Sequence, residues 1–227
     1  MDETILFIPI RRGSKGIPNK NLKMLCGKPL VCWILDTLLS MELQATIWVA
    51  TDSPEAVAVL KERYGEGINV FIRSEESATD TSPVIDVVKE FIRAARPVGT
   101  TNFILAQATV PFTSTKDYAK LFSAISSNTA DSFVSCCRVK KFLWSEEGVP
   151  LSYELDRKPM RQHYKGILIE NGAFYATTVD SIRQTSRLLS GRIGIVETGE
   201  GTLIDIDEES DWIKAEQFIA QKMETNS

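Results

Sequence analysis

The chain has 227 residues and a formal net charge of -4, with 26 Lys and Arg against 30 Asp and Glu. This length allows one domain with a sizeable core, and the apolar fraction of 43% is ordinary for a globular protein. The acidic balance gives no basis for a nucleic-acid or anionic-membrane partner, and we expect neither. The N-terminal stretch MDETILFIPI begins with acidic residues, and its apolar run is too short for a signal core or a membrane span, so we expect a cytoplasmic protein.

The first half of the chain alternates short apolar runs with amphipathic segments. The apolar runs predict strands at 4–10, 45–53, 69–73 and 102–107. The amphipathic segments predict helices at 29–41, 53–65, 82–96 and 114–127. The second of these helices carries a Ser53 cap, Pro54 at its first position and Gly65 at its end. Four successive strand–helix units predict an α/β fold: a mostly parallel sheet with right-handed crossovers and helices on both faces.

In such a sheet ligands bind beyond the carboxyl ends of the strands, so the segments that follow the predicted strands are the candidate site. From about residue 132 the alternation becomes irregular. Residues 131–139 predict a strand, but residues 138–166 contain prolines, charges and scattered aromatic residues without a clear period. We expect a single domain over 1–227 in which 138–166 is an excursion that pairs with another subunit. The remaining pattern predicts strands at 171–178, 192–198 and 202–207, and helices at 179–190 and 208–224.

A basic loop follows the first predicted strand, in the stretch IPIRRGSKGIPNKNLK. Its cationic side chains are Arg11, Arg12, Lys15, Lys20 and Lys23. The two glycines, Gly13 and Gly16, let the backbone approach a ligand closely, and lysines supply point charges to phosphate oxygens, so the loop suits a polyphosphate. The GxxxxGK[ST] and GxGxxG patterns are absent, which excludes the two commonest phosphate-binding fingerprints. The alternative is a solvated basic turn, because charge runs usually face water.

An acid pair occurs near the end of the chain, in LIDID. On a strand, Asp205 and Asp207 project from the same face, so both can reach one cation. Mg²⁺ is often bound by one or two carboxylates together with substrate phosphates. The alternative is that the acids belong to the N-terminus of the last helix, where they are favoured. A polyphosphate loop and a magnesium-binding acid pair together describe phosphoryl or nucleotidyl transfer.

The stretch IPIRRGSKGIPNKNLKMLCGKPL resembles the signature of the CMP-N-acylneuraminate synthetases, the cytidylyltransferases that activate nine-carbon acidic sugars, usually IPARxGSKGIPxKNxxxxxGKPL. The resemblance continues in order through ATDSPEAV, RSEESATDTSPVIDVV, QATVP, RQ upstream of NGAFY, and IDIDEESD. The string SKGIPxKN separates this group from the enzymes for the eight-carbon sugar Kdo. The resemblance implies a Rossmann-like core of the nucleotide-diphospho-sugar transferase type. It also implies CTP and an acidic nonulosonic sugar as substrates, Mg²⁺ as cofactor, and a homodimer.

The resemblance implies roles for individual residues as well. The nucleotide would be bound by Arg11, Ser14, Lys15, Asn21, Arg73, Asp80 and Ser82. The sugar would be bound by Gln107, Arg161 and Gln162, the last two on the dimer arm that reaches into the neighbouring site. Mg²⁺ would be held by Asp205 and Asp207. Lys20, together with Arg11 and Asp207, would carry catalysis, with Lys20 stabilising the pentavalent transition state. The lone histidine, His163, is not a candidate base, since the matching family position varies.

Local interpretations remain open for several of these residues. Arg73 could pair with Glu75 or Glu76 at the surface, Asp80 could cap the helix that begins near Pro83, and Gln107 could bond backbone groups at a strand end. Two departures from the family pattern stand out.

Arg12 replaces a small residue, and QATVP replaces QPTSP, which alters the sugar side through Ala108 and Val110. The sugar could therefore be legionaminic, pseudaminic or deaminated neuraminic acid, or Kdo-like. The chain could also be a non-catalytic CTP-binding module.

Overall fold

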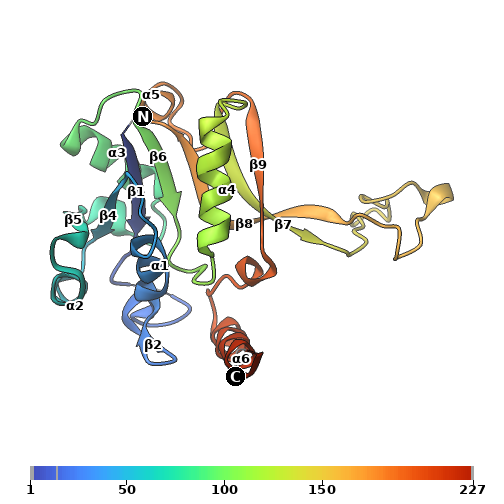
Figure 1. Ribbon diagram of the computed structural model, residues 1–227, viewed down its shortest axis with the longest axis horizontal. Helices are drawn as coiled ribbons and strands as arrows, with labels where there is room; N and C mark the ends of the chain where they lie inside the picture. The colour runs from blue at the N-terminus through green and yellow to red at the C-terminus, as the bar shows by residue number, and fades with distance from the viewer. Residues whose placement is uncertain (1–2, 14, 226–227) are drawn as a thin grey trace.

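A seven-stranded sheet forms the centre of the protein (Figure 1). The computed structural model describes residues 3–13 and 15–225. The strands of this sheet are β1 (Thr4–Pro9), β4 (Thr46–Thr51), β5 (Asn69–Ile72), β6 (Asn102–Ala106), β7 (Ser132–Val139), β8 (Ile167–Thr178) and β9 (Ile193–Thr198). Their order is β5-β4-β1-β6-β8-β7-β9. Strands β5, β4, β1 and β6 are parallel, β8 is antiparallel to both its neighbours, and β9 is parallel to β7.

Helices cover both faces of this sheet. The helices that do so are α1 (Leu30–Leu39), α2 (Pro54–Tyr64), α3 (Val84–Ala95), α4 (Thr115–Ser126) and α5 (Val179–Thr185), whereas α6 (Glu209–Thr225) packs in a separate cluster with Ile17, Leu25 and Ile206. Buried side chains of α1, α2 and α4 pack in one cluster with one face of the sheet, and those of α3 and α5 pack in a second cluster on the other face. The α/β fold with a mostly parallel sheet and helices on both faces is therefore confirmed. None of the helices in the described residues has the length and apolarity needed to span a bilayer.

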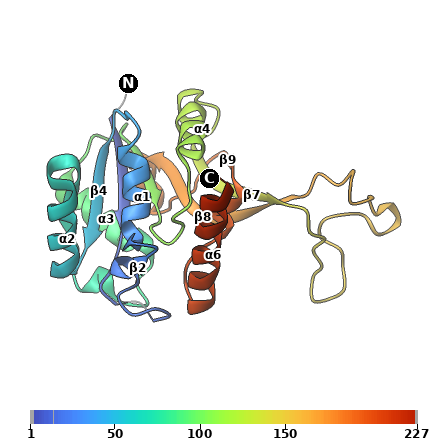
Figure 2. The same cartoon turned by 60° about the horizontal axis from the view of Figure 1, so that its bottom comes forward.

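The local signals in the sequence set several helix boundaries correctly. The Ser53 hydroxyl accepts a hydrogen bond from the Ala56 backbone N–H at the start of α2, Pro54 is its first residue, and Gly65 is its C-cap. The helix predicted from Pro29 begins one residue later, because Pro29 pairs with Met24 in a short hairpin of β2 (Met24–Leu25) and β3 (Lys28–Pro29). That hairpin was not predicted. It packs through Leu25 against α6, which lies beside the basic loop (Figure 2).

The prediction of a strand at 202–207 is wrong. Residues 200–203 form a 3-10 helix (Glu200–Leu203), and residues 204–207 are an extended segment outside the sheet. The Ile206 backbone N–H donates to the carbonyl oxygen of Thr109, 2.8 Å away, in a loop rather than in a neighbouring strand. The side chains still alternate, because Ile206 is fully buried between two more exposed acids. The acid pair therefore has the side-chain spacing of a strand without hydrogen bonds to a neighbouring strand.

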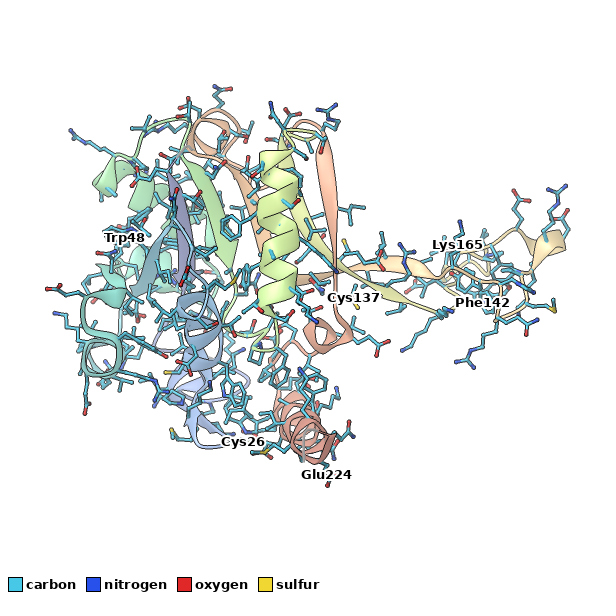
Figure 3. The ribbon with its side chains drawn as sticks, in the orientation of Figure 1. Cys26, Trp48, Cys137, Phe142, Lys165 and Glu224 are labelled. Atoms are coloured by element: carbon cyan, nitrogen blue, oxygen red, sulfur yellow. The ribbon has the colours of Figure 1, made fainter. Side chains whose placement is uncertain are left out.

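Residues 140–166, between β7 and β8, extend away from the body of the protein as an arm (Figure 3). The arm has its own aromatic cluster, in which the Phe142 ring lies 5.0 Å from Tyr153 and 4.7 Å from Tyr164, centroid to centroid. The Lys158 ammonium lies 5.0 Å from the Phe142 centroid. Many of its other apolar side chains are exposed: Leu143, Trp144, Val149, Leu151, Leu155 and Met160.

Candidate active site

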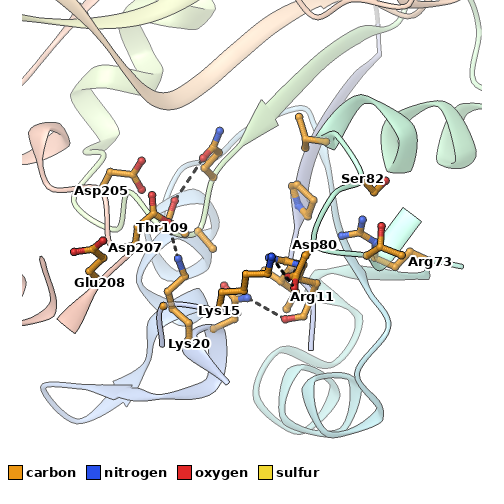
Figure 4. Close-up of a pocket in the computed structure, with 18 residues that line it drawn as sticks. Arg11, Lys15, Lys20, Arg73, Asp80, Ser82, Thr109, Asp205, Asp207 and Glu208 are labelled. Carbon is orange, nitrogen blue, oxygen red and sulfur yellow. Dashed lines mark hydrogen bonds and ion pairs between the residues drawn. The ribbon is translucent and has the colours of Figure 1, made fainter. Parts of the chain in front are cut away.

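A cleft of about 500 Å³ lies at the carboxyl ends of the parallel strands, where the loops after β1, β5 and β6 meet the segment before α6. Figure 4 shows the side chains that line it. Ten of the predicted site residues are brought together here: Arg11, Lys15, Lys20, Asn21, Arg73, Asp80, Ser82, Gln107, Asp205 and Asp207. Ser14 lies outside the described residues. Arg161 and Gln162 lie on the arm and do not line this cleft within one chain.

One wall of the cleft carries a set of ion pairs around Asp80. Its carboxylate accepts a hydrogen bond from Arg11 and lies 3.5 Å from the Lys15 ammonium. These contacts lower the pKa of the Asp80 carboxyl, with the Arg11 hydrogen bond as the main cause. The helix-cap interpretation of Asp80 is wrong, because the N-cap of α3 is Pro83 and the Asp80 carboxylate contacts Arg11 and Lys15 instead.

On the opposite wall, Lys20 joins the basic loop to the acid pair. Its ammonium group donates to the Ile206 carbonyl oxygen at 2.6 Å and to Asp207 Oδ1 at 2.9 Å. Lys20 is 7% exposed, whereas the Asp207 side chain is 72% exposed. A buried ammonium with two oxygen acceptors is firmly placed, so the Lys20 charge has a defined position in the cleft.

The basic loop approaches the acid segment so closely that a side chain would not fit between them. A Cβ atom built on Gly16 would lie 2.1 Å from the backbone oxygen of Asp207. Because backbone atoms cannot move aside as a flexible side chain can, this position requires glycine. The loop and the acid segment are therefore packed backbone against backbone, which holds Lys20 beside Asp207.

Asp205 is a candidate metal ligand, and one oxygen of its carboxylate lacks a hydrogen-bond partner in the described part of the chain. Its Oδ1 is buried and has no hydrogen-bond partner among the described residues. Burial raises the pKa of the Asp205 carboxyl, and the neighbouring Asp207 carboxylate adds to the rise, while the Thr109 hydroxyl and Lys20 oppose it. A buried carboxylate with one oxygen lacking a donor, beside a second carboxylate, is the environment that a hard cation stabilises.

No group of three or more His, Cys, Asp or Glu side chains suited to a metal occurs in the part of the chain that the structure describes. The residues fit Mg²⁺ with Asp205 and Asp207 as its protein ligands and substrate phosphates or water completing the coordination.

Arg73 is buried, and its guanidinium bonds within its own loop. Its Nε donates to Ser77 Oγ at 3.3 Å and its Nη2 to the Ser77 carbonyl oxygen, so pairing with Glu75 or Glu76 is not what holds it. Burial lowers the pKa of Arg73. Ser82 bonds Asp86 at the start of α3, and the Asn21 amide donates to the Arg11 carbonyl oxygen at 3.3 Å. These three residues also line the cleft, and Arg73 and Ser82 lie on the side of Asp80 away from the acid pair, as Figure 4 shows.

Thr109 is a lining residue to which sequence reasoning assigned no role, although QATVP contains it. Its carbonyl oxygen accepts from the Ile206 N–H, and its hydroxyl lies 3.5 Å from the Gln107 amide oxygen. It thus connects the loop after β6 to the acid segment. The substitution at Val110 does not reach the cleft, since this side chain is fully buried in the core, whereas Ala108 lines it.

Arg12 points away from the cleft. Its guanidinium lies 3.5 Å from the exposed Glu55 carboxylate, and its backbone N–H donates to Asp52 at 2.8 Å. The extra charge at this position therefore belongs to a surface ion pair with the start of α2, and only its backbone helps to hold the basic loop.

Comparison with known proteins gives three kinds of match. The sequence model of a family described as cytidylyltransferase matches residues 5–187. Among curated proteins, N-acylneuraminate cytidylyltransferase A from Danio rerio is 34% identical over 220 residues, which cover 94% of this chain and 50% of the relative. The post-translational flagellin modification protein B from Campylobacter coli is 24% identical, and the match covers 98% of this chain and 97% of that protein.

Among solved structures, a CMP:2-keto-3-deoxy-manno-octonic acid synthetase complexed with CTP has a TM-score of 0.70 at 17% identity, covering 97% of this chain and 100% of that chain. At that identity the likeness concerns the fold. The chain spans about half the length of the N-acylneuraminate cytidylyltransferases from Danio rerio that it matches.

Proposed function

The chain belongs to the cytidylyltransferase family, as the sequence motifs indicated, and we propose that it transfers CMP from CTP to a nine-carbon acidic sugar. N-acetylneuraminate or a related nonulosonic acid is the proposed acceptor. Its anomeric oxygen attacks the α-phosphorus of CTP, the bond from that phosphorus to the β-phosphate oxygen breaks, and the anomeric hydroxyl loses its proton. The products are the CMP-sugar, pyrophosphate and the proton that the hydroxyl releases.

One observation carries this proposal: a single cleft contains the basic loop after β1 and the acid segment before α6, joined by the Lys20–Asp207 contact. Arg11 and Lys15 supply positive charge for the outer phosphates. Lys20 lies between them and the acids, where the reacting phosphate would sit. Charge placed in advance around a phosphate that gains charge in the transition state is the main source of catalysis in such reactions.

Mg²⁺ is the proposed cofactor, and Asp205 and Asp207 would hold it together with phosphate oxygens. When bound, it would neutralise charge on the phosphates. The protein's own part is to keep the two carboxylates together despite their repulsion. It does so through the Ile206–Thr109 backbone bond and the Lys20 ammonium. No histidine lines the cleft within the described residues.

We also propose a cytoplasmic homodimer in which the arm of each subunit brings Arg161 and Gln162 to the sugar side of its neighbour's cleft. The exposed apolar side chains of the arm support this proposal, because such a surface favours burial against a partner. The sugar itself is the finer question. The near full-length match to a flagellin modification protein supports testing other nonulosonic acids beside N-acetylneuraminate.

A pyrophosphate-release assay with CTP, Mg²⁺ and a panel of sugars tests the proposal. We expect turnover only when all three components are present, with N-acetylneuraminate among the best acceptors. Preference for legionaminic, pseudaminic or deaminated neuraminic acid, or for Kdo, would change the proposed acceptor sugar but not the proposed CMP transfer. Thermal stabilisation by CTP without turnover on any sugar would identify a non-catalytic nucleotide-binding module instead.

A further inference from the structure

The charges that line the cleft are balanced within the protein itself. Four cationic side chains and four carboxylates line it: Arg11, Lys15, Lys20, Arg73, Asp80, Asp205, Asp207 and Glu208. They are sorted into two groups, as Figure 4 shows, with Asp80 beside Arg11 and Lys15 on one side and Asp207 beside Lys20 on the other. A strongly anionic ligand therefore meets cations that already have partners.

Asp80 differs from the other three acids in what it contacts. The acids before α6 lie together, so a cation can neutralise them as a group. Asp80 comes from the loop between the 3-10 helix at Glu76–Ala78 and α3, and its carboxylate reaches the basic loop across a separation of 69 residues. Its Oδ1 contacts Arg11 and its Oδ2 contacts Lys15, so each carboxylate oxygen faces one cation of the basic loop.

Arg11, Lys15 and Asp80 are partly exposed, so a ligand can compete with the Asp80 carboxylate for the two cations. The side chains of Arg11, Lys15 and Asp80 are 30%, 75% and 37% exposed, and all three line the cleft. The side-chain contacts of Asp80 are with Arg11 and Lys15, and the N-cap of α3 is Pro83 rather than Asp80. The carboxylate can thus move away from the cations without disturbing the fold.

We propose that Asp80 is a place-holder for the triphosphate: it holds Arg11 and Lys15 in the ligand-free protein and is displaced when a polyphosphate binds. The inference rests on the proposed function in taking the triphosphate of CTP as the natural ligand. A carboxylate carries one negative charge, so several phosphate groups can outcompete it at two cations. A ligand with a single anionic group gains less from the same exchange. Asp80 thereby makes the basic loop selective for highly charged ligands.

The sharpest test measures the binding of inorganic tripolyphosphate by calorimetry, without divalent cations, to the wild-type protein and to Asp80→Asn. We expect Asp80→Asn to bind about two- to tenfold more tightly, the range for removing one or two partly exposed ion pairs. Asp80→Ala should change affinity in the same direction. Glu55→Gln is the matched control, because it removes the carboxylate that pairs with Arg12 outside the cleft, and it should leave the affinity unchanged.

Equal or weaker binding by both Asp80 variants would overturn the proposal, since it would mean that the carboxylate orients the two cations for the ligand rather than competing with it. Tripolyphosphate contains no cytosine, ribose or sugar. The result is therefore independent of whether the protein transfers CMP, which the pyrophosphate-release assay decides separately.

Discussion

The Lys20 ammonium lies 2.9 Å from Asp207 Oδ1 and 2.6 Å from the Ile206 carbonyl oxygen, and this contact joins segments 187 residues apart. It places the one buried cation of the basic loop against the acid segment. The contact makes the two halves of the cleft a single unit, so a change on either side is expected to affect the other.

Replacing Lys20 by Ala should lower kcat by about 10²- to 10³-fold, the usual effect of removing one preorganised group that stabilises transition-state charge. The rate of pyrophosphate release at saturating substrates measures it. Lys23→Ala is the matched control, because Lys23 pairs with Glu209 and does not line the cleft. Near wild-type kcat in Lys20→Ala would remove Lys20 from the catalytic assignment.

Gly16→Ala should impair both stability and turnover. The new methyl group would lie 2.1 Å from the Asp207 backbone oxygen, so the basic loop or the acid segment has to shift. Forcing extra atoms into a packed site destabilises by about 1–3 kcal/mol. Denaturant unfolding and the pyrophosphate assay measure the two effects. Gly13→Ala is the control, since a Cβ there has no atom within 4 Å and should change little. Equal behaviour of the two variants would contradict the close packing.

Much of the fold could be predicted because its signals are local. The apolar runs predicted all seven strands of the sheet, and the Ser53, Pro54 and Gly65 signals marked both ends of α2. The cleft followed from a general property of parallel sheets, whose carboxyl ends gather the loops that carry polar residues. Ten residues from separate motifs therefore met in one place.

What could not be predicted depends on contacts between distant segments. The segment 202–207 has the alternation of a strand, but whether a neighbouring strand is available is decided by the rest of the fold, and here Ile206 bonds a loop instead. The pairing of Asp80 with Arg11 and Lys15 is equally non-local. In the sequence, an aspartate shortly before a helix favours a cap, and nothing nearby indicates the cations it meets.

Asp205→Asn should abolish Mg²⁺-dependent turnover without lowering the stability of the ligand-free protein. The wild-type carboxylate is buried with one oxygen lacking a partner, so an uncharged amide removes a cost of burial. Asp207→Asn should also lose activity, but it should lower stability, because it removes a partner of the buried Lys20. Thermal unfolding at neutral pH without divalent cations compares the two. A clear loss of stability in Asp205→Asn would show that its carboxylate is satisfied in the native state.

The lowered pKa of Asp36 predicts part of the pH dependence of the free energy of unfolding. Burial by itself raises the pKa of this carboxyl, but hydrogen bonds from Lys28 and Tyr64, with the charge of Arg63, outweigh it and lower the pKa below 3.8. The native state then binds the proton less tightly than the unfolded state. The charged Asp36 carboxylate therefore stabilises the native state at a pH above the pKa that the carboxyl has in the unfolded state. This contribution is lost as the pH falls through the lower pKa of the native state.

Asp36→Asn should therefore lower the free energy of unfolding at neutral pH by about 1–3 kcal/mol, the usual result of breaking a partly buried charged hydrogen-bond network. It should also flatten the decline of stability in acid. Tyr64→Phe removes the 2.7 Å hydrogen bond to Asp36 together with a longer one of 3.4 Å to the Cys32 carbonyl oxygen, and it should give a smaller loss in the same direction. Denaturant titrations between pH values of about 3 and 7 measure both slopes. An unchanged acid slope in Asp36→Asn would remove this carboxyl as a source of acid sensitivity.

If the arm completes the neighbouring subunit's site, two variants that are each inactive alone should recover activity when they form a mixed dimer. Arg161 lies on the arm, outside the cleft of its own chain, whereas Lys20 lines that cleft. If each arm completes the neighbouring subunit's site, then Lys20→Ala and Arg161→Ala are each inactive as homodimers. A mixed dimer has one site with an intact Lys20 and an intact incoming Arg161, so co-expression of the two variants should recover activity.

Differently tagged copies, purified for both tags and assayed for pyrophosphate release, measure this recovery. Lys20→Ala co-expressed with Asp207→Ala is the control, because Lys20 and Asp207 belong to the same cleft of one chain. That pair should stay inactive, since neither site of the mixed dimer contains both residues. Recovery in the control would mean that the acid segment and the basic loop act across subunits. No recovery with Arg161→Ala, in a mixed dimer shown to form, would place Arg161 outside the neighbouring site.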